Sequence, residues 1–423
     1  MSEIQTDYTE MLEDLGKRAK LAARDLADAP TYSKNQALLK SAASIQAQQS
    51  HILSENAKDM EAAEEKGLTG AMLDRLVLDK SRVEAMAQGL KDIASLDDPI
   101  GTILSEVTRP NGLAIQRKRV PLGVIGIIYE SRPNVTADAG ALCLKAGNAA
   151  ILRGGSESFF SSAAILECLH EGLKQAYLPV DAVQRIPTRN RAAVGAMLGL
   201  SDYIDVIVPR GGKSLIERIT EESKIPLFKH LEGICHSYVD KDADLEMAKN
   251  IVLNAKMRRT GVCGSTETLL IDEHVADKML PSIIDGLIDL GCEVRGDEQT
   301  QAIDSRVQKA SAEDWDTEYL DSIISVRTVS GVGQAIEHIE AHSSNHTDAI
   351  ITDNPETAEM FLNSVDSAIV MVNASTQYAD GGEFGMGAEI GISTGKLHAR
   401  GPVGVEQLTS SKYVVRGNGQ CRP

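Results

Sequence analysis

The chain has 423 residues, of which 42% are hydrophobic and 25% charged, so it is long enough for two domains with ordinary hydrophobic cores. Its formal net charge of −18 and its aromatic content of 4% argue against nucleic acid or anionic lipid as a partner, because an acidic surface repels polyanions and few side chains could stack on bases. The six cysteines form no CxxC pair, and there is no signal peptide or membrane-spanning apolar run, so we expect a cytoplasmic protein without a metal site.

The first half of the chain predicts a helical region, a hairpin and a parallel sheet. Residues 4–98 are rich in Ala, Leu, Lys and Glu with helical spacing of the apolar positions. The alternating runs 103–109 and 113–119 flank Asn111-Gly112, which predicts a hairpin. Buried strands are then predicted at 120–130, 149–155, 183–187 and 203–212, separated by helices at 136–148, 156–177, 190–199 and 213–222.

A second strand–helix series follows in the other half of the chain. Strands are predicted at 267–271, 293–296, 324–329, 348–352 and 367–373, and helices at 244–256, 274–290, 332–341 and 355–364. A tail strand is predicted at 412–417. The alternation of strands and helices in both halves predicts an α/β protein with two doubly wound parallel sheets.

One cysteine has an unusual setting. Cys263 lies in TGVCGSTETL, two residues after Gly261 and directly before Gly264, and a basic run precedes it. Glycines allow close approach of backbone and ligand, and nearby cations favour the nucleophilic thiolate. A reactive thiol is therefore one reading, and an inert buried cysteine is the alternative.

Glycine-rich turns provide candidate ligand sites. Gly154-Gly155 and Gly211-Gly212 each follow a predicted strand and precede a helix, where backbone N–H groups can bind phosphate. Neither is a complete fingerprint, so ordinary loop chemistry is the alternative for each. The segment 380–394 contains five glycines and a possible ribose contact, Glu383, but it also suits tight backbone packing.

Long strings of the sequence resemble one enzyme family. NAKMRRTGVCGSTETLLI is similar to the nucleophile segment of the aldehyde dehydrogenase superfamily. VPLGVIGIIYESRPNVTADA, LCLKAGNAAILRGGSE, FKHLEGICHSYVD and DGGEFGMGAEIGISTGKLHARGP resemble its gamma-glutamyl phosphate reductase (glutamate-5-semialdehyde dehydrogenase) family. The similarity extends from about residue 10 to the end of the sequence.

The resemblance implies the reaction. It is the NADPH-dependent reduction of L-glutamyl 5-phosphate to L-glutamate 5-semialdehyde with release of phosphate, the second step of proline biosynthesis from glutamate. Cys263 would form a thioester with the substrate. Its backbone N–H and a side chain near Tyr129–Asn134 would stabilise the oxyanions, and Ser131 and Asn134 are both candidates for that side chain.

The resemblance also implies binding residues. Those expected to bind NADPH or NADP are Arg153, Gly154, Gly155, Ser156, Glu157, Gly211, Gly212, Glu383 and Phe384. Those expected to bind substrate are Lys256, Arg259, Asn373 and Ser375. The charge of Arg153 suits the 2′-phosphate that distinguishes NADPH from NADH.

Three positions depart from related sequences. Thr260 replaces the usual proline, and Gln377 replaces an arginine, so we expect changes in substrate affinity. His230 stands where hydrolytic relatives carry a general-base glutamate. We predict that His230→Glu increases thioester hydrolysis, and an unchanged ratio of glutamate to semialdehyde would refute this.

The family architecture implies a division of labour along the chain. Residues 1–102 and 120–243 are expected to bind NADPH, 244–397 to carry Cys263, and 103–119 with 398–423 to form an oligomerisation flap of a homodimer or homotetramer. Glutamate 5-kinase is a possible partner. The alternatives are another acylating or oxidising member of the superfamily, which a comparison of substrates would reveal, and a scaffold without catalytic activity, in which Cys263 would be dispensable.

Overall fold

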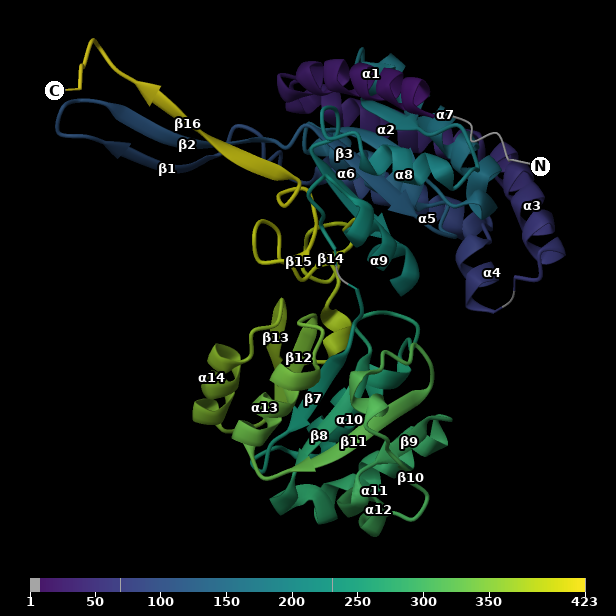
Figure 1. Ribbon diagram of the computed structural model, residues 1–423, viewed down its shortest axis with the longest axis vertical. Coiled ribbons are helices and arrows are strands. Elements are labelled where there is room, and N and C mark those ends of the chain that lie inside the picture. Colours follow the sequence, from purple (N-terminus) through teal and green to yellow (C-terminus); the bar gives the residue numbers. More distant parts are fainter. Residues whose placement is uncertain (1–7, 69, 230, 423) are drawn as a thin grey trace. The chain divides into compact units, whose positions relative to one another are not determined.

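The computed structural model describes residues 8–422 except 69 and 230. The chain divides into two compact units, drawn in Figure 1. Unit 1 comprises Met1–Lys229, Gly385–Gly391 and Val403–Pro423, and unit 2 comprises His230–Phe384 and Ile392–Pro402. The chain thus first passes from unit 1 to unit 2 between residues 229 and 230, where the sequence predicted a boundary between 243 and 244.

The centre of unit 1 is a four-stranded parallel sheet in the order β5-β4-β3-β6. Its strands are β3 (Val124–Tyr129), β4 (Ala149–Arg153), β5 (Val183–Arg185) and β6 (Val206–Arg210). The helices that follow them are α6 (Val135–Lys145), α7 (Phe159–Gln175), α8 (Ala192–Leu198) and α9 (Lys213–Glu222). Every residue of β3 and β4 is buried, as their continuous apolar sequences predicted.

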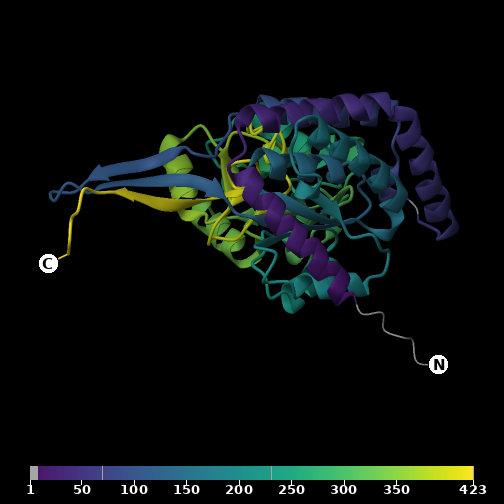
Figure 2. The ribbon, with the colours of Figure 1, turned by 90° about the horizontal axis from the view of Figure 1, so that it is seen from above.

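The N-terminal part of unit 1 is helical, which confirms the prediction for its described residues. Its helices are α1 (Thr9–Ala27), α2 (Thr31–Ala47), α3 (Gln49–Glu65), α4 (Ala71–Leu76) and α5 (Lys80–Ser95). Helix α2 packs against α5 and α7. Figure 2 shows the N-terminal helices of unit 1 in purple. The buried residues of α2 recur at helical spacing, for example Ala37, Leu38, Ala42 and Ile45.

A three-stranded antiparallel sheet, here called the flap, extends from unit 1 (Figure 1). It consists of β1 (Ile103–Thr108), β2 (Ala114–Pro121) and β16 (Thr409–Arg416). The predicted hairpin and tail strand are therefore confirmed, and β2 pairs with both of the other strands. Every residue of β1 is exposed.

Unit 2 contains a seven-stranded sheet in which all pairs are parallel, in the order β10-β9-β11-β8-β7-β12-β13. Its strands are β7 (Cys235–Val239), β8 (Thr266–Asp272), β9 (Glu293–Gly296), β10 (Gln308–Lys309), β11 (Ile323–Val329), β12 (Thr347–Ile351) and β13 (Ile369–Val372). Its helices are α10 (Leu245–Met257), α11 (Glu273–Asp289), α12 (Glu298–Ile303), α13 (Val332–His342) and α14 (Pro355–Ser364). A short pair, β14 (Ile392–Ser393) and β15 (Gly401–Pro402), lies outside this sheet.

Helices cover both faces of the unit 2 sheet. One buried cluster joins alternate residues of β7 and β8, such as Val239 and Leu269, to helices α10 and α11. A second cluster joins the neighbouring residues, such as Tyr238 and Leu270, to α13 and α14. Side chains alternate between the faces of a strand, so this arrangement is the doubly wound architecture that the sequence predicted.

Strand β7 was not predicted, although it lies inside the sheet. Its sequence, Cys-His-Ser-Tyr-Val, has no apolar run, yet all five residues are buried. The imidazole of His236 contacts Asp348 at 2.9 Å, and the hydroxyl of Ser237 contacts that of Thr266 at 2.8 Å. These distant partners bind the Nδ1 of His236 and the Ser237 hydroxyl, although the His236 Nε2 has no hydrogen-bond partner. Such contacts make a central position possible for a polar strand. Because β7 belongs to this sheet, unit 2 begins before the predicted position.

Candidate active site

Cys263 lies in the turn between α10 and β8, here called the nucleophile turn (residues 258–265). The side chain is half-buried and is not part of a disulfide. It packs beside a small apolar cluster together with Ala374. The buried members of that cluster are Ala349, Ile369, Met371, Ala379 and Ile392. The Cys263 side chain therefore packs against apolar residues, and the residue remains partly exposed to solvent.

Two residues, one just before β7 and one at its start, lie against the backbone of Cys263. A Cβ atom at Gly233 would be 2.0 Å from the Cys263 carbonyl oxygen, so only glycine permits this approach. The thiol of Cys235 donates a hydrogen bond to the same oxygen at 3.1 Å. Sequence reasoning missed both residues, because they are nearly 30 positions away from Cys263 in the chain.

A 3₁₀ turn, η4 (Thr376–Tyr378), holds the nucleophile turn from another direction. The side-chain amide of Gln377 donates to the carbonyl oxygens of Ala255 at 3.0 Å and Arg259 at 3.1 Å. The hydroxyls of Thr376 and Thr266 lie 2.9 Å apart. Gln377 is buried and contacts backbone carbonyls, so position 377 supports the turn in this protein.

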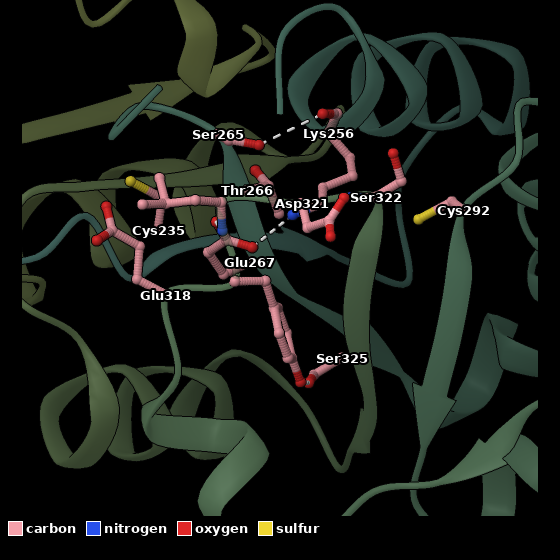
Figure 3. A network of polar contacts seen from close by, with 12 residues as sticks. Cys235, Lys256, Ser265, Thr266, Glu267, Cys292, Glu318, Asp321, Ser322 and Ser325 are labelled. Atoms are coloured by element: carbon pink, nitrogen blue, oxygen red, sulfur yellow. Dashed lines mark hydrogen bonds and ion pairs between the residues drawn. The ribbon is translucent and has the colours of Figure 1, made fainter. Parts of the chain in front are cut away.

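The basic residues before Cys263 differ in their surroundings. Lys256 is fully buried, and its ammonium group pairs with the equally buried carboxylate of Glu267 (Figure 3). This internal partner takes the place of the substrate contact that the sequence predicted for Lys256. Arg259 is exposed, and it is therefore the better placed of the two to meet a dissolved anion.

The other two residues predicted to bind substrate, Asn373 and Ser375, both contact the backbone. Asn373 accepts a hydrogen bond from the backbone N–H of Thr352 and donates one to its carbonyl, each at 2.9 Å. Ser375 is buried and accepts from the N–H of Gln377 at 3.3 Å. Asn373 also has a positive φ of 52°, which its short amide side chain tolerates.

In unit 1, one carboxylate connects two of the predicted sites. Glu157, in the 3₁₀ turn η1 (Ser156–Ser158), accepts from the backbone N–H of Ser131 at 2.6 Å and from its hydroxyl at 2.9 Å. Ser131 is buried and has a left-handed φ of 45°. The structure thus brings Glu157, a candidate for cofactor binding, together with the oxyanion-donor candidate Ser131.

The first glycine turn borders a small, narrow pocket at the carboxyl ends of β4 and β5. The pocket is lined by Gly154, Gly155, Phe159, Ser162, Arg185, Ile186 and Thr188. A Cβ atom at Gly154 would lie 3.1 Å from the Tyr129 ring, and one at Gly155 would overlap the Glu157 carboxylate. The two glycines therefore keep the backbone close to the pocket.

Arginines surround this pocket. Arg153 is buried and donates to the Arg189 carbonyl at 3.2 Å, while its Nε has no hydrogen-bond partner. Burial lowers the pKa of the Arg153 guanidinium, with the Glu157 carboxylate opposing that effect. Arg185 stacks 4.2 Å from the centre of the Phe159 ring, and Arg189 lies 4.8 Å from it. This is a local concentration of positive charge on an acidic protein.

The second glycine turn already binds a carboxylate. Glu130 accepts a hydrogen bond from the Gly212 N–H at 2.9 Å, at the start of α9. A Cβ atom at Gly211 would lie 2.6 Å from the same carboxylate. An anionic side chain therefore occupies the position where a phosphate was expected from the sequence.

Asn134, the other oxyanion-donor candidate, donates to Asp138 at 2.8 Å. Burial raises the pKa of Asp138 to about 6, against the opposing effects of the Asn134 hydrogen bond and Arg210. Glu383 and Phe384 are exposed at the end of the first segment of unit 2, whereas Arg153 and Glu157 belong to unit 1. The prediction for His230 falls outside the described residues.

The remaining buried cysteines differ from Cys263. Burial raises the pKa of the thiols of Cys143, Cys168 and Cys235, and it raises that of Cys292 to about 12. They are therefore poor nucleophiles at neutral pH. Within the described part of the chain there is no cluster of His, Cys, Asp or Glu that could hold a metal ion. Nor does any described helix combine the length and apolarity needed to cross a membrane.

Comparison with known proteins shows two levels of similarity. The sequence profile of the Aldehyde dehydrogenase family matches residues 1–314. A protein from Paramagnetospirillum magneticum named gamma-glutamyl phosphate reductase is 66% identical over 418 residues, which cover 99% of each chain. A protein of the same name from Rhodospirillum rubrum is 64% identical over 417 residues, or 99% of this chain and 98% of that one.

A solved structure agrees with these sequence matches. The crystal structure of a gamma-glutamyl phosphate reductase from Thermotoga maritima superposes with a TM-score of 0.95 at 42% sequence identity. The match covers 97% of this chain and 100% of that chain. The similarity therefore includes both units and the flap.

Proposed function

The chain belongs to the aldehyde dehydrogenase family, as one of its gamma-glutamyl phosphate reductases, and we propose that it reduces L-glutamyl 5-phosphate to L-glutamate 5-semialdehyde through Cys263. This is the reductive step of proline biosynthesis from glutamate. The observation that carries the mechanism is the position of Cys263, a half-buried thiol on a turn fixed from two sides.

The proposed covalent step uses the good leaving group of an acyl phosphate. The Cys263 sulfur bonds to the carbonyl carbon while the bond to the phosphate oxygen breaks, which leaves a thioester and free phosphate. A backbone N–H of the nucleophile turn and a side chain from the Ser131–Asn134 region would stabilise the oxyanion. Arg259, exposed four residues before Cys263, is the proposed contact for an anionic group of the substrate.

A nicotinamide cofactor fits the residues around the first glycine turn. The two close-packed glycines allow a close backbone approach to a nucleotide, and the partner-free Nε of buried Arg153 offers a donor. Glu157 can accept from a ribose hydroxyl if it releases Ser131. When bound, the cofactor supplies the hydride that converts the thioester to the aldehyde.

We assign the preference for NADPH to the arginines at this pocket. A 2′-phosphate carries the extra negative charge that NADH lacks, and guanidinium groups bind phosphate with charge-assisted hydrogen bonds. Arg153 is largely buried, while Arg185 is half-buried and Arg189 is exposed. Arg185 and Arg189 are therefore the proposed phosphate contacts. Arg153 supports Arg189 by donating a hydrogen bond to its carbonyl oxygen.

Two further features concern partners. We propose that the flap joins copies of the chain in a homo-oligomer, because β1 and β16 are edge strands that carry exposed apolar residues such as Val107 and Val415. We also propose a cytoplasmic location. Contact there with glutamate 5-kinase would limit exposure of the acyl phosphate to water.

An assay in the reverse direction tests the function. The purified protein is given pyrroline-5-carboxylate, phosphate and NADP, and formation of NADPH is followed by absorbance. We expect turnover that depends on phosphate and is faster with NADP than with NAD. Turnover of simple aldehydes that ignores phosphate would instead indicate an oxidising member of the family, and no turnover at all would favour a scaffold.

A further inference from the structure

A buried ion pair lies at the base of the nucleophile turn. Lys256 is in the last turn of α10 and Glu267 is the second residue of β8, so the pair joins the two elements between which Cys263 lies. Neither side chain is accessible to solvent. Ser265 adds a hydrogen bond from its hydroxyl to the Lys256 carbonyl at 3.3 Å, which Figure 3 shows beside the pair.

The same pair is connected to the other side of the turn. The backbone N–H of Leu320 donates to Glu267 at 3.3 Å, and the neighbouring Glu318 accepts from the N–H of Gly233 at 2.9 Å. Gly233 is the residue whose backbone lies against the Cys263 carbonyl. A continuous path of contacts therefore runs from Glu267 through residues 318–320 to Gly233 and Cys263.

Stability alone is a poor explanation for this pair. Two charges lose their hydration when they are buried, and well-packed apolar side chains of the same volume are often as stable or more so. Burial is strong enough to raise the pKa of the Glu267 carboxyl to about 7, even though Lys256 opposes the shift. What an ion pair adds is a specific geometry, and this one joins the two elements between which Cys263 lies.

We propose that Lys256 and Glu267 are positioning residues, whose ion pair holds the nucleophile turn in the conformation in which the Cys263 thiolate attacks the acyl phosphate. The inference rests on the proposed role of Cys263. The charged and titratable groups around Glu267 come from every neighbouring element: Lys256 of α10, Cys235 of β7, Cys292 before β9, and Glu318, Tyr319 and Asp321 of the segment before β11.

Three variants separate positioning from stability. Glu267→Gln removes the charge with little change in shape, Lys256→Met removes the other charge, and the double variant Lys256→Met/Glu267→Leu replaces the pair by apolar packing. Lys34→Met is the matched control, because Lys34 forms a buried ion pair with Asp98 in unit 1. For each protein, kcat, KM for NADP, the melting temperature and the rate of Cys263 alkylation by iodoacetamide are measured, with the alkylated residue identified by mass spectrometry.

We expect kcat and the alkylation rate of the double variant to fall by about 10- to 100-fold at a melting temperature close to that of the wild type, with KM for NADP unchanged. A double variant that regains both stability and kcat would show that the pair is only structural. If the double variant does not fold, Glu267→Gln decides: a wild-type kcat overturns the proposal, and a reduced kcat at an unchanged melting temperature supports it.

The alkylation rate also keeps the two proposals distinguishable. It needs no substrate, so it reports the conformation of the turn even if the wild-type protein fails to turn over pyrroline-5-carboxylate. Inactive wild-type protein would contradict the proposed function. An alkylation rate that is the same in the wild type and all three variants would contradict the positioning role.

Discussion

Gly233 lies so close to Cys263 that a Cβ atom at position 233 would be 2.0 Å from the Cys263 carbonyl oxygen. Gly233→Ala should therefore displace the nucleophile turn and lower the free energy of unfolding by about 1–3 kcal/mol, the usual cost of overpacking. Activity should fall further than stability explains. Gly261→Ala is the control, since a Cβ atom there would meet nothing within 4 Å. Equal behaviour of the two variants in urea unfolding and turnover would contradict this reading.

Replacement of the proposed nucleophile tests the chemistry directly. Cys263→Ala should lower kcat by roughly 10³-fold or more, because no thioester can form. The half-buried position suggests only a small loss of stability. Cys421→Ser, at an exposed cysteine, should keep full activity. The reverse assay with pyrroline-5-carboxylate measures both, and an active Cys263→Ala protein would rule out the thioester route.

Cofactor preference should depend on Arg189. Its guanidinium lies over both Phe159 and Phe160, at the edge of the pocket beside Gly154. Arg189→Leu should weaken NADPH binding by about 10-fold or more, the value of one charge-assisted hydrogen bond, and leave NADH binding nearly unchanged. Arg218→Leu, which removes a surface ion pair on α9, should change neither affinity. Titrations of nucleotide fluorescence measure both constants, and equal weakening of NADH and NADPH would contradict the assignment.

Acid should destabilise unit 2 through His338. Its imidazole accepts a hydrogen bond from Arg327 at 2.7 Å and lies near His236 and His342. Burial, followed by the electrostatic effects of His236, His342 and Arg327, lowers its pKa to about 2, from 6.5 in an unfolded chain. The unfolded state therefore binds the proton more tightly. The contribution of neutral His338 to the free energy of unfolding is fully present above pH 6.5. It is lost as the pH falls below that value, by about 1.4 kcal/mol per pH unit.

His338→Phe isolates this contribution. Between pH 7 and pH 5, the free energy of unfolding of the variant should fall by about 2 kcal/mol less than that of the wild type. Urea unfolding followed by Trp315 fluorescence measures both values. The comparison is needed because Glu267 and Asp138, with pKa values raised to about 7 and 6, favour the folded state as the pH falls. Parallel stability curves for the two proteins would contradict the assignment to His338.

The flap should control assembly. Tyr413 and Val415 are exposed on β16, an edge strand, and both lie on the same face of it. Tyr413→Glu/Val415→Glu would place charges where a second copy is proposed to pack, so we expect a monomer in sedimentation experiments. Lys412→Glu alters the opposite face and should leave assembly intact. A double variant that sediments like the wild type would exclude this face as the contact.

The sequence predicted those parts of the fold in which neighbouring residues share one environment. Strands such as β3 and β4 are apolar throughout, because both faces are covered, and that pattern is visible locally. Strand β7 was missed, because its buried imidazole and hydroxyl bind Asp348 and Thr266, whose proximity depends on the folded sheet. The position where unit 2 begins was misplaced for the same reason.

The same distinction applies to the candidate site. Cys263 was recognisable from its glycine neighbours, but Gly233 and Gln377 support it through contacts that no local pattern reveals. Lys256 was a candidate for substrate binding, because it belongs to the basic run before Cys263 and position 377 lacks the arginine of related sequences. Its partner, Glu267, lies in a strand whose residues are all buried, and a carboxylate in such a strand was the one available signal of a buried pair.

The flap has a consequence for synthesis of the protein. Strand β2 ends at residue 121 and leaves the ribosome early, whereas its partner β16 begins only at residue 409. At roughly 5–20 residues per second, β2 waits about 15 seconds or longer with one edge unpaired. Three consecutive cations, Arg117, Lys118 and Arg119, stand in that strand. Their mutual repulsion would keep nascent chains on one messenger from pairing through this edge before each is complete.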